Sequence, residues 1–280
     1  MSSAWQENRL IVHPGFPSKF LSTRRDVIVY IPPGYRESVD RYPVLYLQDG
    51  QNLFDPGTAF GGQDWRAHET ADALISQGIV EPLIIVGIHN TGIKRISEYT
   101  PSRCPRRRKG GKADRYAEML AREVKPFIDH EYRTRKGAAH AGVGGSSLGA
   151  LAALVTGLAY PRVFGKLALL SPSVWWDSRV ILKMVAAYRK KDHPRIWLDS
   201  GTEEGDNPRQ IVDDARALRD ALTAKGWREG VDLLYCEKPG AGHCEAAWGG
   251  RLGEVLTWLF PASATSQTNA SDQWSSMART

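Results

Sequence analysis

Residues 144–154, GGSSLGALAAL, join a short apolar run to a segment that is apolar on nearly every side. The run Ala138–Val143 predicts a β-strand, and the segment after Gly149 predicts a helix buried against a sheet. Between the two, Gly145, Ser147 and Gly149 form the pattern G-x-S-x-G. Its glycines allow a sharp turn without Cβ clashes, so the Ser147 hydroxyl would project above the sheet at the amino end of the helix. We therefore interpret Ser147 as a candidate nucleophile.

Strands and helices alternate along the chain. Short β-branched or apolar runs predict the other strands, at Val27–Ile31, Val44–Leu47, Leu83–Ile88, Lys166–Leu170, Arg195–Leu198 and Asp232–Cys236. Apolar residues at helical spacing predict the other helices, at Ala113–His130, Ile181–Tyr188, Pro208–Ala224 and Ala246–Phe260. This alternation predicts an α/β fold with a mainly parallel central sheet covered by helices on both faces, and with its chemistry at the carboxyl ends of the strands. Together with the G-x-S-x-G turn, it is typical of the α/β-hydrolase fold.

Length and composition favour one compact unit. The chain has 280 residues, of which 42% are hydrophobic and 24% are charged, close to the average of soluble globular proteins. An α/β sheet protein of this length can form a single domain, which we expect to span residues 1–261. Residues 262–280, ASATSQTNASDQWSSMART, are small and polar and predict a disordered tail.

The distribution of charge limits the class of partner. The formal net charge of +6 favours encounter with anionic ligands. Much of the excess is concentrated in residues 103–112, RCPRRRKGGK, which lack apolar periodicity and predict an exposed loop. Because no motif that reads nucleic acid accompanies this loop, we expect a small-molecule partner and no nucleic acid.

Cysteine usage and hydropathy bear on the compartment. The three cysteines, Cys104, Cys236 and Cys244, are scattered and form no C-x-x-C pair, which favours a reducing environment. No stretch approaches the roughly 18 apolar residues of a membrane span, and the N-terminal residues show no export signal. We therefore expect a cytoplasmic protein that does not bind membranes, and the sequence leaves its oligomeric state open.

Ser147 needs a general base, because a serine hydroxyl is a poor nucleophile until a neighbouring group accepts its proton. Histidine suits this role near neutral pH, and in α/β-hydrolases it follows the acid, which follows the serine. Two histidines follow Ser147 in the chain. His193 precedes the strand Arg195–Leu198 and would lie at its amino end. His243 follows the strand Asp232–Cys236 and would lie at the catalytic edge, so we assign His243 as the base.

The acid should follow the intervening strand, where the sequence IWLDSGTEEGD offers several carboxylates. The pattern G-x-x-acid that starts at Gly201 favours Glu204. This residue would hold His243 in the correct tautomer and stabilise its protonated form. Asp206 and Glu203 remain alternatives, whereas Asp199 is expected to lie within the strand.

The oxyanion that forms on a substrate carbonyl needs two preorganised donors. One is the amide after the nucleophile, here that of Leu148, and the other comes from the loop after the third strand, which begins Asp49, Gly50, Gln51. The small Gly50 permits a close approach, so the backbone N–H of Gln51 is the second candidate donor. The alternative interpretation of these residues is an ordinary Asp-Gly turn.

Seven segments between about Arg25 and Phe260 carry a family resemblance: VIVYIPPGY, PVLYLQDGQNLFD, ISEYTP, GGSSLGALAAL, YPRVFGKLALLSPSVWW, LDSGTEEGD and PGAGHCEAAW. With them the chain resembles the putative esterase family of α/β-hydrolases. This family includes enterochelin esterases, feruloyl and acetyl-xylan esterases, and relatives of S-formylglutathione hydrolase. One departure is Ala150, where many members have a second glycine, but alanine is also small. The resemblance implies a serine esterase without cofactor or metal, and it does not choose the ester.

Aromatic and charged residues near the predicted site are candidates for substrate binding. Trp65 and Trp248 follow the two loops of that site, and Trp176 and Arg95 follow the ends of other strands. Aromatic walls suit a phenolic or other flat ligand. The alternatives are that the tryptophans pack the core and that Arg95 pairs with Glu98 to brace the loops.

Hydrolysis of a carboxylic ester through an acyl-enzyme on Ser147 is the function these residues favour. Two alternatives use the same fold, namely an acyltransferase that passes the acyl group to an alcohol, and a binding protein without catalysis. The intact set of Ser147, His243 and an acid argues against the second. We expect a small or aromatic ester as substrate, with short-chain acyl, feruloyl-type and anionic siderophore esters as candidates. The cationic residues 103–112 favour an anionic one.

Overall fold

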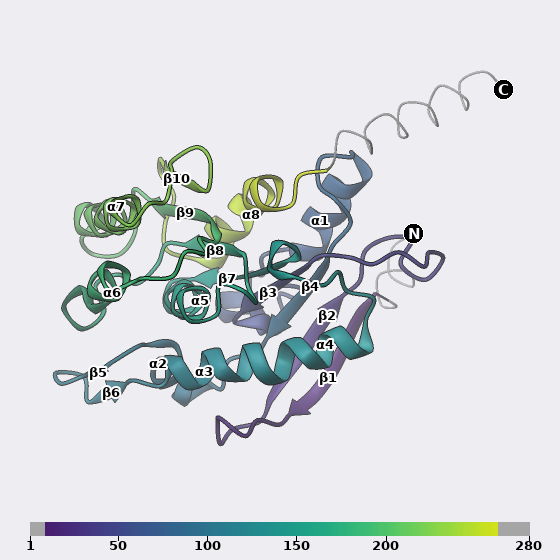
Figure 1. Cartoon of the computed structure of the whole chain (residues 1–280), viewed down its shortest axis with the longest axis horizontal. Coiled ribbons are helices and arrows are strands. Elements are labelled where there is room, and N and C mark those ends of the chain that lie inside the picture. Colours follow the sequence, from purple (N-terminus) through teal and green to yellow (C-terminus); the bar gives the residue numbers. More distant parts are fainter. Residues whose placement is uncertain (1–8, 263–280) are drawn as a thin grey trace.

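The computed structural model describes residues 9–262, so residues 263–280 of the predicted tail lie outside the described residues. Its central feature is one eight-stranded sheet with the order β1-β2-β4-β3-β7-β8-β9-β10 (Figure 1). The strands are β1 Leu10–Phe16, β2 Arg25–Tyr30, β3 Val44–Gln48, β4 Ile84–Ile88, β7 Ala141–Ser146, β8 Lys166–Leu170, β9 Arg195–Gly201 and β10 Leu233–Lys238. From β4 to β10 all neighbours are parallel, and the two antiparallel pairings are β1 with β2 and β2 with β4. The prediction of a mainly parallel sheet is confirmed.

Helices cover both faces of this sheet (Figure 1). On one face, α1 (Ala67–Ser76) packs against α8 (Glu245–Leu259). The opposite face carries α3 Ala113–Met119, α4 Lys125–Glu131, α5 Leu148–Ala159, α6 Trp176–Ala186 and α7 Pro208–Ala224, with the short α2 Arg95–Tyr99 against α3 and α5. The described residues also contain four short 3-10 helices: η1 Gly50–Asn52, η2 Phe60–Gly62, η3 Gly92–Lys94 and η5 Ala138–His140. The α/β-hydrolase prediction is confirmed.

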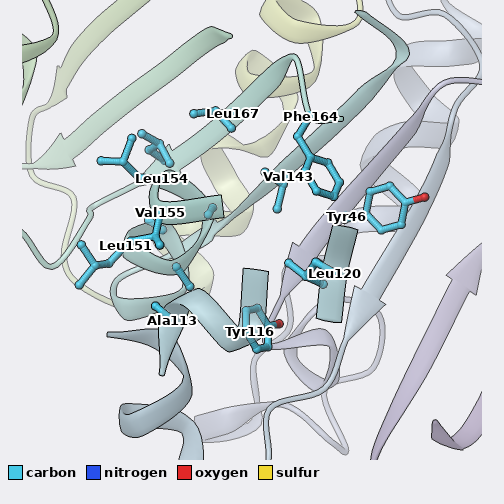
Figure 2. Close-up of a cluster of buried hydrophobic side chains, with 14 of the residues drawn as sticks. Tyr46, Ala113, Tyr116, Leu120, Val143, Leu151, Leu154, Val155, Phe164 and Leu167 are labelled. Carbon is cyan, nitrogen blue, oxygen red and sulfur yellow. The ribbon is translucent and has the colours of Figure 1, made fainter. Parts of the chain in front are cut away.

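The core between α5 and the sheet fixes the position of residue 147. Glycines allow close packing here, since a Cβ on Gly157 of α5 would lie 2.4 Å from Cδ2 of Leu167 on β8. Figure 2 shows part of the buried hydrophobic cluster to which Leu167 belongs, including the side chains of Tyr46, Ala113, Tyr116, Leu120, Val143, Leu151, Leu154, Val155, Phe164 and Leu167. Because interiors are packed at crystal density, the first turn of α5 is held rigidly above the sheet.

The predicted helix Ala113–His130 is interrupted rather than regular. A π-helical turn, η4 (Leu120–Val124), separates α3 from α4, and Pro126 follows it at the start of α4. Proline has no N–H to donate and its ring clashes with the carbonyl four residues earlier. Wider π-type spacing just before the proline lets the helix continue past it.

Residues 103–112 form a hairpin instead of the irregular loop that the sequence predicts. In it, β5 (Arg103–Cys104) pairs antiparallel with β6 (Lys109–Gly110). Gly110 has a φ of 105°, and a Cβ there would lie 2.3 Å from the carbonyl oxygen of Ser102. The glycine thus closes the base of the hairpin, while its cationic side chains are exposed as predicted.

Membrane-spanning segments were also sought among the described residues. No helix in that part of the chain is both long enough and apolar enough to cross a bilayer.

Candidate active site

Ser147 joins β7 to α5 in a backbone conformation that few residues adopt, with φ 56° and ψ −121°. The glycines on either side of it lie against β3. A Cβ on Gly145 would be 3.0 Å from the Cβ of Gln48, and a Cβ on Gly149 would be 3.1 Å from the same atom. Both distances are shorter than ordinary Cβ contacts, so β3 requires small residues on both sides of the turn. The G-x-S-x-G pattern therefore places residue 147 at the carboxyl edge of the sheet.

His243 lies in the loop between β10 and α8, and its ring reaches Ser147. The distance from Nε2 to the Ser147 Oγ is 2.9 Å, although 96 positions separate the two residues in the chain. The ring also packs edge-on against Trp248, with centroids 4.8 Å apart and an interplanar angle of 82°. The Trp248 indole thus limits rotation of the imidazole. The carboxyl ends of β7 and β10 open to the same edge, which brings the two loops together.

Glu204 lies just after β9, on the far side of the imidazole from Ser147. Its Oε2 is 2.8 Å from Nδ1 of His243, and its side chain is 0% exposed. Its other oxygen, Oε1, accepts a hydrogen bond from the hydroxyl of Ser171. The other two carboxylates weighed from the sequence, Glu203 and Asp206, are exposed. Of the three, Glu204 is the one that the structure brings to His243.

Behind Glu204 lies a buried polar layer that sequence reasoning missed. Ser171, the residue after β8, accepts hydrogen bonds from Nε1 of Trp248 and Nη2 of Arg251, both at 3.0 Å. Nη1 of Arg251 lies 3.1 Å from Oδ1 of Asp199 and 3.8 Å from Oε1 of Glu204. Burial raises the pKa of Asp199 to about 6. The one signal in the sequence was an arginine on the apolar, buried face of α8.

The loop after β3 carries Gln51, the second candidate donor to the oxyanion. The backbone of Asp49 is in the left-handed helical region, with φ 57° and ψ 47°. Gly50 follows it in contact with β4. A Cβ on Gly50 would lie 2.5 Å from the backbone carbon of Gly87, so any side chain there would push the loop away. Gln51 lies in η1 and Leu148 begins α5. The N–H groups in the first turn of a helix have no partner within that helix, which leaves both amides free to donate to an oxyanion.

Arg95 holds this loop rather than pairing with Glu98. Its Nε and Nη2 each donate to the carboxylate of Asp49 at 2.7 Å, and Nδ2 of Asn90 donates to the same carboxylate at 2.8 Å. Burial alone would lower the pKa of Arg95, but the charge and hydrogen bonds of Asp49 more than offset this and raise it. Glu98 pairs instead with the buried Arg25, at 3.1 Å. The predicted Arg95–Glu98 pair is therefore wrong.

A pocket of about 470 Å³ opens where Ser147 and His243 meet. Its lining consists of Asp49, Gln51, Asn52, Thr58, Phe60, Asn90, Arg95, Ser146, Ser147, His243, Glu245 and Trp248. Two of the four residues predicted to bind substrate, Arg95 and Trp248, therefore line it.

The other two predicted substrate-binding residues lie elsewhere. Trp65 packs behind Trp248, with ring centroids 6.3 Å apart, and lines a separate groove between α1 and α8. Trp176 is 1% exposed, and its Nε1 donates to the carbonyl of Ser102 at 3.1 Å. Because the base of the β5–β6 hairpin covers Trp176, its prediction as a substrate-binding residue is wrong.

Glu245, at the start of α8, adds a carboxylate to the pocket. Its Oε1 accepts a hydrogen bond from Nδ2 of Asn52 at 2.7 Å, and burial raises its pKa. The rings of Phe60 and Trp248 line the same pocket. A substrate would therefore meet both aromatic surface and hydrogen-bonding groups.

The cationic hairpin lies beside the site, outside the pocket lining. Ser102 at its base contacts Trp176, and Ser173, three positions before Trp176, has its Oγ 3.2 Å from that of Ser147. Six cationic residues follow Ser102, namely Arg103, Arg106, Arg107, Arg108, Lys109 and Lys112. Among the described residues, none of these six is in an ion pair with a carboxylate.

The assembled groups have the geometry of nucleophilic acyl transfer. A histidine at this distance can accept the Ser147 proton, and a buried carboxylate on its other nitrogen can stabilise the imidazolium that results. Gln51 lines the same pocket as Ser147 and Leu148 follows Ser147 in the chain, so the amides of two helix starts are candidates to receive negative charge. No cluster of three or more His, Cys, Asp or Glu side chains suited to a metal ion occurs within residues 9–262.

Comparisons with known proteins agree with this chemistry. Residues 18–259 match the family model described as "Putative esterase". Uncharacterized protein YbbA of Bacillus subtilis is 26% identical over 255 residues, which cover 88% of this chain and 96% of that protein. The siderophore enterobactin esterase of Emericella nidulans is 30% identical over 210 residues, covering 69% of each. The crystal structure of the BES protein from Bacillus cereus superposes with a TM-score of 0.72 at 20% identity and covers 93% of this chain and 96% of that one, which supports the fold.

Proposed function

This chain belongs to the putative esterase family and is a carboxylic ester hydrolase, and on that premise we propose that Ser147 is its nucleophile and His243 its general base. We assign Glu204 as the acid that orients His243. The observation that carries the proposal is the hydrogen-bonded line from Ser147 through His243 to Glu204, with distances of 2.9 and 2.8 Å. This line is the arrangement that acyl transfer through a serine requires.

The reaction proceeds in two halves. Oγ of Ser147 attacks the ester carbonyl carbon while Nε2 of His243 takes the hydroxyl proton, and the N–H groups of Leu148 and Gln51 bind the oxyanion. The intermediate collapses, the bond to the alcohol oxygen breaks, and His243 returns the proton to that oxygen. Water then attacks the acyl-enzyme with the same base, and the carboxylic acid leaves with Ser147 restored.

Covalent labelling tests the nucleophile. A fluorophosphonate probe should label the wild-type protein at Ser147, and Ser147→Ala should abolish labelling and nearly all hydrolysis of p-nitrophenyl butyrate. His243→Ala should lower the rate by at least about 10⁴-fold. Ser76→Ala, an exposed serine on α1, is the matched control and should change neither. Labelling at another residue, or full activity of Ser147→Ala, would contradict the mechanism.

For the natural substrate we propose an ester with an aromatic part and an anionic part. The rings of Phe60 and Trp248 favour the aromatic part. The carboxylate of Glu245 opposes negative charge inside the pocket, so the anionic part would lie outside it, beside the hairpin. The Emericella nidulans relative is named for a siderophore ester, which combines both properties. Feruloyl-type esters would use only the aromatic rings of the pocket. Short-chain esters would use neither the rings nor the cationic hairpin.

Removal of charge from the hairpin tests this choice. Changing Arg106, Arg107 and Arg108 together to Ala should slow hydrolysis of an anionic catecholate ester and leave p-nitrophenyl butyrate unaffected, and high salt should do the same to the wild type. The matched control changes three exposed cations that precede β7, β8 and β9 at the opposite edge of the sheet: Lys136, Arg162 and Lys191. Equal effects of the two triple variants would rule out the proposal of an anionic substrate, and the protein would then be a general carboxylesterase.

A further inference from the structure

The hydroxyl of Ser171 has three side-chain partners whose chemistry fixes the direction of each hydrogen bond. Trp248 Nε1 and Arg251 Nη2 each lie 3.0 Å from its Oγ, and both can only donate. A hydroxyl has two lone pairs and one hydrogen. Since both lone pairs are occupied, the hydrogen of Ser171 must be donated to Oε1 of Glu204.

The donor and acceptor of each further hydrogen bond toward Ser147 follow from this one. Oε1 of Glu204 accepts a second hydrogen bond from the N–H of Gly201 at 2.6 Å. Both hydrogens are donated to Oε1, which leaves Oε2 to accept Nδ1–H of His243. Nε2 of His243 then has its lone pair free toward Ser147 at 2.9 Å. The chain of bonds from Arg251 to Ser147 therefore runs in one direction.

Arg251 lies between two buried carboxylates. Its side chain is 5% exposed, and those of Asp199 and Glu204 are 0% exposed. At a pH above the Asp199 pKa of about 6, one positive charge against two negative charges leaves Arg251, Asp199 and Glu204 with a net charge of −1, and protonation of His243 brings the four groups to zero. Because uncompensated charge is costly in an interior, the cluster favours the protonated His243 that forms when Ser147 attacks.

We propose that Ser171, Arg251 and Asp199 are positioning residues that orient Glu204 and balance the charge of His243 when it carries the proton. The inference rests on the proposed roles of Ser147, His243 and Glu204. Arg251 acts on Glu204 directly and through Ser171. Asp199 acts through Arg251, at 3.1 Å.

Other charged groups also face these residues and remain constant in the test below. Glu245 and the Asp49–Arg95 pair face His243 from the pocket. On the neighbouring strand β10, Cys236 lies opposite Asp199. These groups give every variant the same background, so a change in pH dependence reports the substituted charge.

Two substitutions change the charge of the cluster in opposite directions. Arg251→Met removes a positive charge, so His243 should hold its proton more tightly and the acid limb of the kcat/KM profile should move to higher pH. Asp199→Asn removes a negative charge and should move the acid limb to lower pH. We expect shifts of about half a pH unit or more. Both variants should lose about 10- to 100-fold in kcat, with KM for p-nitrophenyl butyrate changed by less than about threefold.

Two further variants separate orientation from charge. Arg251→Lys keeps the positive charge but cannot bridge Ser171 and Asp199, so kcat should fall while the acid limb stays near that of the wild type. Ser171→Ala leaves all charges in place and should behave similarly. Arg216→Met is the control, because Arg216 is in an exposed ion pair with Glu237 on β10 and should change neither kcat nor the profile.

Circular dichroism and urea titration verify that each variant folds. If Arg251→Met does not fold, the results for Asp199→Asn and Arg251→Lys decide whether the positioning role holds. Opposite shifts of the acid limb in Arg251→Met and Asp199→Asn would support the inference, since a purely structural defect would not change sign. Shifts of the same sign, or unchanged kcat and profiles in the folded variants, would overturn it. Ser147→Ala in the same assay separates the two proposals: activity in this variant refutes the proposed nucleophile, whereas its inactivity beside unaffected cluster variants refutes the positioning role alone.

Discussion

Arg95→Met should loosen the oxyanion loop. In the wild type, two of the three hydrogen bonds from side chains to Asp49 come from Arg95, and the Asp49 side chain is 7% exposed. Removing one partner of a fully buried ion pair costs about 3–5 kcal/mol. Because the Arg95 side chain is 26% exposed, solvent screens part of this, and we expect the free energy of unfolding to fall by about 2 kcal/mol.

The effect on catalysis should fall on kcat. Asp49 and Gly50 lead directly into Gln51, and loss of one oxyanion donor lowers kcat by about 10²- to 10³-fold in serine hydrolases. We expect a decrease at the lower end of that range with little change in KM. Steady-state hydrolysis of p-nitrophenyl butyrate and urea unfolding measure the two effects. Arg95→Lys keeps the charge but loses the fork of two donors, so it should recover only part of the loss.

The control for this experiment is Lys94→Met, which removes an equal charge from an exposed neighbouring position. It should leave kcat unchanged. The reasoning would be refuted if Arg95→Met kept its kcat on p-nitrophenyl butyrate and raised KM only for an anionic ester. In that case Arg95 would be a substrate contact, as the sequence suggested.

Three further predictions follow from the same geometry. Glu204→Gln should lower kcat by about 10³- to 10⁴-fold because the tautomer of His243 is no longer held, whereas Glu203→Gln should be neutral in the same assay. Asp199 should contribute a fall of about 3 kcal/mol to the free energy of unfolding as pH rises from about 4 to 6, because the folded state retains a proton on Asp199 that the unfolded state has lost, its pKa being raised from 3.8 to about 6. Asp199→Asn should lose this slope, and parallel urea-denaturation curves for the two proteins would disprove the assignment. Prolonged treatment with EDTA should leave the rate unchanged, and activity restored by added Zn²⁺ would contradict a metal-free mechanism.

The sequence predicted the parts of the site that depend on chain order and strand ends. Ser147 was identified by a turn that only small flanking residues permit, and His243 was the candidate placed at the carboxyl edge. Glu204 was favoured over Asp206 and Glu203 by a loop pattern, and the structure brings Glu204 to the imidazole at 2.8 Å. Local chemistry and topology were sufficient to predict that these three side chains would lie together.

The rest depended on contacts between distant segments. No role was predicted for Arg251, because its partners lie on other elements. Trp176 looked like a pocket wall because nothing local indicated that the base of the hairpin would cover it. Strand β1 was missed because Pro14 and Gly15 interrupt its pattern, and a bulge between His13 and Phe16 accommodates them at the sheet edge.

The distance along the chain between the proposed catalytic groups makes activity a reporter of folding. Ser147 and His243 are 96 positions apart, and Glu204 and His243 are 39 apart. Contacts of such sequence separation form late, after local helices have appeared. During refolding from urea, reactivity toward a fluorophosphonate should therefore return more slowly than the far-UV circular dichroism signal, because the serine becomes nucleophilic only when α8 has docked and brought the imidazole with it.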